Sequence, residues 1–273
     1  MKRKKIAFWT LIVGQILRGT FVFGQRTTET IFLDSVPNPL EKSGWELVFN
    51  DEFDGDTLNT SKWWAQSGIH NDEAQFYTPR HDNVFLKNGM LYLRAIRENF
   101  KDSLPYTSGE IFSSIEFGKG HYCEIRCKIP SGKGLWPAFW FWRGSNENYQ
   151  EIDVFEYWCA DTRRFSISNH YLKYPGTLKG KSEFKWIQPR NADGEKMDMS
   201  GKFITYAAYW DDDGIRVLVN NRLVLHFKKH IPSNPFPLIL NLAVEGGRGR
   251  QPDSKTVFPA DFIIDYVRVY RRK

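Results

Sequence analysis

The feature that most limits the possible folds of this chain is a period-two alternation of apolar and polar residues in many short segments. In His121–Ile129 the apolar side chains occupy every second position, and Gly89–Ile96 and Ile264–Tyr270 repeat the pattern. Such alternation is typical of β-strands with one buried face. No window has the apolar spacing of a long amphipathic helix. Many short strands bounded by turn residues predict an all-β fold, either a β-sandwich or a barrel.

Turn chemistry in the second half of the chain supports the same fold class. Asn220-Asn221 separates two strand-like stretches, Ile215–Val219 and Arg222–Phe227. Asn tolerates the positive φ that tight hairpin turns require. The three stretches together therefore predict a β-hairpin.

The first 24 residues differ from the rest in charge and in hydropathy. They hold five basic residues and no acidic one, and an apolar stretch at Ile6–Leu17 precedes the small residues Val22 and Gly24. This is the layout of a secretory signal peptide. The apolar stretch is shorter than the ~20 residues that a membrane-spanning helix needs. We therefore expect residues 1–24 to be a signal peptide, the protein to be secreted or periplasmic, and the chain to have no membrane span.

Removal of this leader would change the meaning of the net charge. The formal charge of +6 falls to +1 because 33 basic and 32 acidic residues remain. The remaining basic residues form no aromatic-interleaved reader motif, so we expect no nucleic-acid partner. Residues 25–43 are polar and contain Pro37 and Pro39, which predicts a short linker. Residues 44–273 show no second change in composition, so we expect one domain and a monomer.

Three cysteines are too few for a disulfide scaffold. Cys123 and Cys127 alternate with polar residues and point to the predicted core. They lie about 13 Å apart along one strand, too far to bridge each other. Cys159 could pair with either of them across strands, which would leave at least one free thiol. No Cys/His spacing typical of a metal site is present.

Tryptophans dominate one side of the strand-like stretch Gly134–Trp142. Trp136, Trp140 and Trp142 share that side, and Leu and Phe occupy the other. One side can face the core, and the other would then display Trp rings on an open surface. Flat aromatic rings suit stacking on the apolar faces of a ligand. A wholly core position for these tryptophans is the alternative.

Three carboxylates follow closely in the next strand-like stretch. Glu151 and Asp153 share a face by simple alternation, which would turn Glu156 to the opposite face. One extra residue, a β-bulge near Val154-Phe155, returns Glu156 and Trp158 to the face of the first two acids. Carboxylates gathered on an apolar strand repel one another and resist desolvation, so such a row rarely serves stability.

Close carboxylates have a direct use in glycoside hydrolysis. That reaction needs one ionised carboxylate and one protonated acid on either side of the scissile bond. Repulsion between like charges raises the pKa of one acid and keeps its proton available near neutral pH. Asp153, between the two glutamates, could hold or relay that proton. Trp rings beside the row would stack on sugar faces.

The segment Glu151–Glu156 resembles the E-x-D-x-x-E signature of glycoside hydrolase family 16. Further segments resemble the laminarinase branch of this family. They are Leu47–Gly55, Tyr106–Ile111, Pro130–Trp140, Leu238–Gly247 and Asp265–Tyr270. The resemblance spans roughly residues 44–271, so the catalytic domain is expected to fill 44–273.

The resemblance implies a two-sheet β-jelly-roll with a substrate cleft across its concave face. It implies retaining endo-hydrolysis of a β-linked polysaccharide, with β-1,3-glucan as the expected substrate and no cofactor for catalysis. Glu151 matches the nucleophile, Glu156 the general acid/base and Asp153 the assisting carboxylate. Trp136 and Trp140 match sugar-stacking positions.

Other positions match the family one by one. His170 lies where the family often has a histidine in the cleft, although a buried core His is the alternative. Asn71 and Glu73 match a loop that lines the donor side. Asp265 matches a ligand of a structural calcium ion, with a plain turn or strand-start Asp as the alternative.

A second substrate class remains open at this point. Arg248 and Arg250 stand where laminarinases often carry Trp, and residues 172–199 form a family-unusual segment rich in Lys and Arg. Arg forks suit sulfate groups. The chain could therefore hydrolyse a sulfated or red-algal galactan, with Arg248 as a binding residue. A carbohydrate-binding jelly roll without catalysis is the third hypothesis, but it has no need for three carboxylates.

Overall fold

A computed structural model describes residues 28–32, 39–71, 73–100, 104–144, 149–172, 180–247 and 249–273. The predicted signal peptide and Arg248 lie outside the described residues. In the described part, every regular element is a β-strand. No helix in that part is long and apolar enough to cross a membrane.

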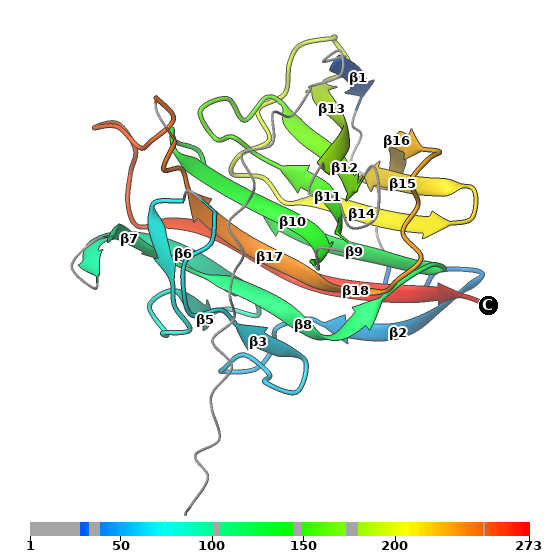
Figure 1. The fold of residues 1–273 in the computed structure, drawn as a ribbon, viewed down its shortest axis with the longest axis horizontal. Coiled ribbons are helices and arrows are strands. Elements are labelled where there is room, and N and C mark those ends of the chain that lie inside the picture. Colours follow the sequence, from blue (N-terminus) through cyan, green and yellow to red (C-terminus); the bar gives the residue numbers. More distant parts are fainter. Residues whose placement is uncertain are drawn as a thin grey trace, which may run out of the picture.

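Eight strands form the sheet that carries the predicted catalytic residues, here called the first sheet. In spatial order they are β1 (Thr28–Phe32), β13 (Gly180–Arg190), β12 (Phe165–Leu172), β11 (Gln150–Glu156), β10 (Leu135–Arg143), β17 (Phe236–Val244), β8 (Glu110–Phe117) and β3 (Trp63–Ala65). Figure 1 shows β11, β10, β17 and β8 as neighbours in the middle of this sheet.

The second sheet packs against the first. Its order is β16 (Arg222–Phe227), β15 (Gly214–Val219), β14 (Ile204–Asp211), β9 (His121–Lys128), β18 (Ala260–Arg272), β6 (Leu91–Phe100), β7 (Leu104–Ser108) and β4 (Gln75–Tyr77). Two further strands join it, β2 (Trp45–Asp51) beside β18 and β5 (Val84–Leu86) beside β6. The prediction of an all-β, two-sheet sandwich is confirmed.

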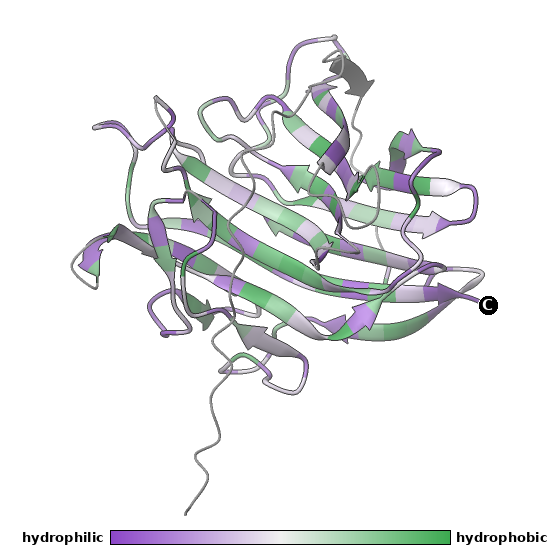
Figure 2. Cartoon of the chain, in the orientation of Figure 1, coloured by the Kyte–Doolittle hydropathy of each residue, from purple (hydrophilic) through white to green (hydrophobic). Residues whose placement is uncertain are grey.

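The core lies between the two sheets and contains the apolar residue of each alternating pair. Phe139 and Phe141 of β10 and Ile125 of β9 are fully buried in one continuous cluster. Figure 2 shows alternating hydrophobic and hydrophilic residues along the strands. This alternation is why one face of each sheet is buried. Apolar burial of this kind contributes about 25 cal/mol for each Å² removed from water. The other face of the first sheet, here called the open face, is thereby left for function.

Two local predictions are confirmed in detail. The hairpin β15–β16 turns at Asn220 and Asn221, whose φ values are 46° and 61°. Cys123, Cys127 and Cys159 are all buried and none forms a disulfide. The pairing of Cys159 that the sequence left open therefore does not occur, and the thiols pack as small apolar groups.

The segment predicted as a linker, 25–43, takes part in the fold at two places. Residues 28–32 form β1, which pairs in parallel with β13. Near its other end, the Leu40 carbonyl accepts a hydrogen bond from Tyr270 at 2.9 Å, and Lys42 Nζ lies 3.2 Å from the buried Glu124 carboxylate. Polarity and prolines could not reveal these long-range partners.

Candidate active site

The three carboxylates lie on one face of β11 because of a β-bulge. On the neighbouring strand β10, Trp140 faces Asp153 while Ala138 faces Glu156, so β11 has one residue more than β10 over this interval. The bulged residues Val154 and Phe155 are fully buried. The predicted bulge is therefore confirmed, and Glu156 returns to the open face with Glu151 and Asp153.

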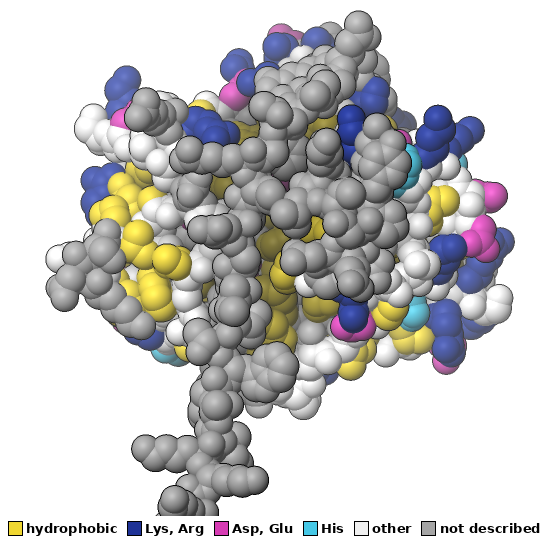
Figure 3. Space-filling model, viewed as in Figure 1, with side chains coloured by type: hydrophobic (Ala, Val, Ile, Leu, Met, Phe, Trp, Pro, Cys, Tyr) yellow, Lys and Arg dark blue, Asp and Glu magenta, His cyan; other side chains and the backbone are white. Residues whose placement is uncertain are grey.

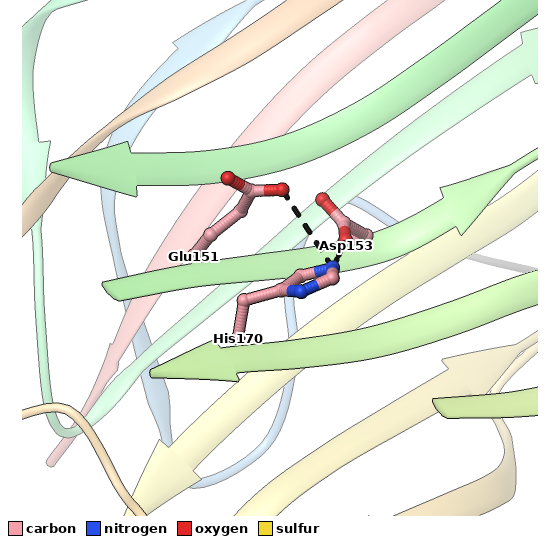
Figure 4. A group of neighbouring side chains, drawn as sticks. All are labelled: Glu151, Asp153 and His170. Carbon is pink, nitrogen blue, oxygen red and sulfur yellow. Dashed lines mark ion pairs between the residues drawn. The ribbon is translucent and has the colours of Figure 1, made fainter. Parts of the chain in front are cut away.

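His170 on β12 faces the first two carboxylates. Its Nε2 lies 3.0 Å from Asp153 Oδ2 and 3.8 Å from Glu151 Oε1. Figure 4 shows the ring pointing from β12 toward both acids on β11. Asp153 is only 3% exposed, so its charge depends on this imidazole for compensation. The cleft position predicted for His170 agrees with this geometry, and the core alternative does not.

Each glutamate is held by its own hydrogen-bond donors. The Tyr149 hydroxyl donates to Glu151 Oε2 at 2.5 Å. On the other side of the row, Trp136 Nε1 donates to Glu156 Oε1 at 3.1 Å and the Ser166 hydroxyl donates to Glu156 Oε2 at 3.2 Å. Directed donors of this kind fix the side-chain orientation of each glutamate.

The electrostatics of the row favour retained protons. Burial raises the pKa of Glu151 to about 7, and the charge of Asp153 adds to the shift while His170 opposes it. Burial and the charge of Asp153 likewise raise the pKa of Glu156 to about 8. Burial lowers the pKa of His170, but the charges of Glu151 and Asp153 outweigh it and raise that pKa to about 9. At neutral pH the site therefore holds a cationic imidazole beside acids that share protons.

An aromatic wall flanks the Glu156 end of the row. Trp136 and Trp158 stack with ring centroids 4.4 Å apart and planes 20° from parallel. The Arg250 guanidinium lies 4.9 Å from the centroid of Trp158. Trp140, on the same face, donates from Nε1 to the Asn241 side chain at 3.0 Å. Trp136, Trp140 and Trp158 thus lie on the open face and not in the core.

The loop before β4 adds a second polar cluster. Asn71 donates to Glu73 at 3.1 Å, and His70 Nε2 lies 2.9 Å from the fully buried Glu110 of β8. Burial lowers the pKa of His70, but Glu110 outweighs it and raises the pKa to about 9, with a contribution from Glu151. Glu73 also pairs with Glu245, which follows β17, so the predicted Asn71 and Glu73 loop lies beside the sheet that carries the three carboxylates.

Asp265, the predicted calcium ligand, already has a cationic partner. Its carboxylate forms an ion pair with Arg126 of the neighbouring strand. Over the described ranges, only Glu151, Asp153 and His170 gather as three or more possible metal ligands. A cation would compete with the Arg126 guanidinium for the same oxygens, so the carboxylate of Asp265 serves as the partner of an arginine.

Several contacts were missed by reasoning from the sequence. Tyr149 lies two residues before Glu151, so strict alternation would have placed it on the acidic face. Alternation could not have placed Ser166, His70 and Glu110, because they reach the site from other strands or loops. No local pattern in the sequence predicts which distant strands become neighbours.

Known proteins resemble this chain in sequence and in fold. The model of the glycosyl hydrolases family 16 matches residues 51–266. The chain is 30% identical to a "Beta-glucanase" of Rhodothermus marinus over 99% of its own length and 97% of that protein. It is 28% identical to "Glucan endo-1,3-beta-glucosidase A1" of Niallia circulans over 85% of its own length, but it spans only 38% of that protein.

Two solved structures resemble the fold closely. The laminarinase catalytic domain of Thermotoga maritima matches with a TM-score of 0.73 and 30% identity, covering 85% of this chain and 100% of that one. A structure from work on endo-acting O-glycanases of the human gut microbiota that initiate mucin breakdown matches with a TM-score of 0.75 and 29% identity. It covers 87% of this chain and 94% of that one.

Proposed function

The chain belongs to glycosyl hydrolases family 16, and on this premise we propose that it is a secreted endo-acting hydrolase of β-1,3-glucan that retains anomeric configuration. The observation that carries the proposal is the row of Glu151, Asp153 and Glu156 on one open face, with the pKa of both glutamates raised by burial. The names of the β-glucanase and laminarinase relatives support the substrate.

The mechanism is a double displacement. The ionised Glu151 carboxylate attacks the anomeric carbon while Glu156 gives its proton to the departing glycosidic oxygen. The bond from carbon to that oxygen breaks, and a covalent glycosyl-enzyme forms on Glu151. Glu156, now ionised, takes a proton from water, and the resulting hydroxide displaces Glu151. The sugar leaves with its original configuration because two inversions have occurred.

Asp153 and His170 influence the reaction through the effect of their charges on the pKa of Glu151. The imidazolium next to Asp153 and Glu151 makes it easier to ionise the nucleophile, because it opposes the rise in the pKa of Glu151. Burial and the charge of Asp153 raise the pKa of both glutamates. A proton held in this row near neutral pH suits the acid that must donate it to the leaving oxygen.

The galactan alternative loses support at Arg250. This side chain lies over the Trp158 ring and has Nη1 3.6 Å from Glu245 Oε1. A guanidinium already facing a carboxylate attracts sulfate less strongly. Figure 3 shows many Lys and Arg side chains along the edge of the visible face. Arg248 lies outside the described residues and remains a proposed binding residue only.

Product analysis on a panel of polysaccharides tests the substrate. The purified protein should release short oligosaccharides from laminarin and fewer or none from agar, carrageenan and porcine mucin. Mixed-linkage glucan separates strict β-1,3 cleavage from a broader β-glucanase. Release from a sulfated galactan or from mucin alone would contradict the glucan assignment. Proton NMR of the first products should show the β-anomer, and an initial α-anomer would contradict retention.

Secretion is tested separately. Expression of the full chain in a bacterial host with a periplasm should give a product whose N-terminus begins near Gln25. Recovery of the exported protein with Met1 intact would contradict a cleaved leader.

A further inference from the structure

The basic segment that begins at residue 172 supplies a strand of the catalytic sheet. Its described part forms β13, which lies two strands from β11 on the side opposite β10. The backbones of β11 and β13 are therefore about 10 Å apart. Strand β13 itself has no role in the mechanism described above.

Strand register connects β13 to the catalytic row. Ser166 of β12 faces Glu156 on one side and Trp186 on the other. Ser168 stands in the same way between Asp153 and Phe184. Residues that face one another across strands project to the same side of a sheet. Ile187, the next residue along β13, is fully buried in the core, so Trp186 and Phe184 belong to the open face.

The two rings form a small platform together with one cation. Phe184 and Trp186 meet edge to face, with centroids 5.4 Å apart and planes at 85°. Arg164, an exposed residue just before β12, places its guanidinium 4.6 Å from the centroid of Trp186. Trp186 itself is only half-buried. Packing against Phe184 and Arg164 limits its rotamers and leaves part of the ring accessible.

We propose that Trp186, Phe184 and Arg164 form a sugar-binding subsite for the leaving-group part of the glucan chain. The inference rests on the proposed function and deepens it. Aromatic rings bind the apolar faces of pyranose units, and a guanidinium donates hydrogen bonds to their hydroxyl groups. An endo-acting enzyme must hold sugars on both sides of the bond that it cleaves. The loop of Asn71 and Glu73, which matches the donor side, pairs with Glu245 at the end of β17. Because β13 lies on the other side of β11 from β17, the platform is assigned to the leaving-group side.

The charges at the platform favour a neutral glycan. Arg164 Nε lies 3.6 Å from Asp161, and Asp161 also accepts from Arg163 at 2.7 Å. The guanidinium of Arg164 therefore faces an aromatic ring and a carboxylate. Because Asp161 already neutralises this cation in part, Arg164 is better suited to bind sugar hydroxyl groups than a sulfate group.

The test compares a polymer with a short chromogenic donor. Trp186→Ala removes the ring, and Trp186→Phe keeps an aromatic face. Phe203→Ala is the matched control, because Phe203 also carries an arginine guanidinium, Arg126 at 4.7 Å, but on the outer face of the second sheet. Substrates are laminarin and an aryl glycoside of a short β-1,3-glucan, whose leaving group is the aryl ring alone. Thermal denaturation confirms that each variant folds.

The expected result is a split between substrates. Trp186→Ala should raise KM for laminarin about tenfold, as expected for loss of one aromatic contact, and leave kcat/KM for the aryl glycoside within about twofold. Trp186→Phe should recover most of the loss, and Phe203→Ala should change neither substrate. Equal losses on both substrates, or no loss on laminarin, would overturn the subsite. A wild-type protein that cleaves no β-glucan would instead refute the proposed function.

Discussion

The two sheets of this protein differ in the partners that they provide for acidic side chains. On the outer face of the second sheet, Glu124 is fully buried but lies 3.2 Å from Lys42 Nζ. Glu52 nearby receives two hydrogen bonds from Arg268, at 2.9 and 2.8 Å. On the open face of the first sheet, Glu151 and Asp153 share one imidazole, that of His170. Paired charges stabilise the fold, whereas crowded carboxylates are arranged for proton transfer.

The pKa shifts follow this difference. Burial raises the pKa of Glu52, but its hydrogen bond and charge interaction with Arg268 outweigh burial and lower the pKa. Burial also raises the pKa of Glu151 and Glu156, and there the neighbouring Asp153 adds to the rise. Glu52 therefore stays ionised beside Arg268, whereas Glu151 and Glu156 keep their protons to higher pH. The difference lies in the partner that the tertiary structure supplies.

The largest expected effect comes from removing the nucleophile. Glu151→Gln should lower kcat on laminarin by at least about 10⁴-fold, as for other catalytic nucleophiles. Folding raises the pKa of Glu151 above its ordinary value of 4.5. At any pH above 4.5 the ionised carboxylate therefore destabilises the folded protein relative to the unfolded chain. The neutral variant Glu151→Gln should accordingly be at least as stable as the wild type at pH 7. Kinetics and thermal denaturation of the same preparation check both statements. Retained activity would refute the role of Glu151.

On the second sheet, breaking a pair should affect stability and leave catalysis unchanged. Lys42→Met removes the cation beside the buried Glu124 and should cost about 2 kcal/mol of unfolding free energy at neutral pH. Urea denaturation measures the loss. The double variant Lys42→Met with Glu124→Gln should regain most of it, because the buried charge is gone as well. A change in kcat on laminarin larger than about twofold would contradict the separation of the two faces.

The pH dependence of kcat/KM should reflect the titration of Glu151 and Glu156 on the first sheet. Below about 7 Glu151 becomes protonated and cannot attack, and above about 8 Glu156 loses the proton that it must donate. A bell-shaped profile should therefore peak between these values, with limbs that belong to the coupled pair. The charge of His170 lowers both pKa values, so His170→Gln should move both limbs to higher pH. Movement to lower pH would contradict this sign.

His170 also links stability to pH. Its pKa in the folded protein, about 9, exceeds the ordinary value of 6.5. Its contribution to stability is therefore fully present below pH 6.5 and is lost as the pH rises through about 9. The loss should be absent from the His170→Gln variant when unfolding is measured across this range.

The smallest effect should come from Asp265. Its ion pair with Arg126 is partly exposed, with 40% of the Arg126 side chain and 30% of the Asp265 side chain accessible. Asp265→Asn should cost between about 0 and 1 kcal/mol. Calcium or a chelator should leave the Tm of the wild type unchanged. A rise of several degrees with calcium would show that a metal displaces Arg126.

Prediction from the sequence was strongest where chemistry and strand periodicity agreed. The alternation in β9 and β18, the hairpin at Asn220-Asn221 and the bulge at Val154-Phe155 follow from residues close together in the chain. The bulge was predictable because three acids cannot be divided between the core and the open face without burying a charge. Trp136 and Trp140 were placed correctly for a related reason, since only one side of β10 could fill the core.

Long-range partners were not predictable in this way. The linker assignment missed β1 and Lys42, and the calcium assignment missed Arg126, because each contact joins segments that are distant in sequence. The hydrogen bond between His70 and Glu110 joins residues 40 positions apart, and no local sequence pattern indicates it.

The sequence by itself therefore determined the fold class and the shared face of Glu151, Asp153 and Glu156, because side-chain alternation is a property of the backbone. Only the tertiary structure decided which cation stands beside which carboxylate, that the three thiols stay free, and that Trp186 lies in register with Glu156. Those outcomes depend on the order and register of non-consecutive strands, which are set by the packing of the two sheets as a whole.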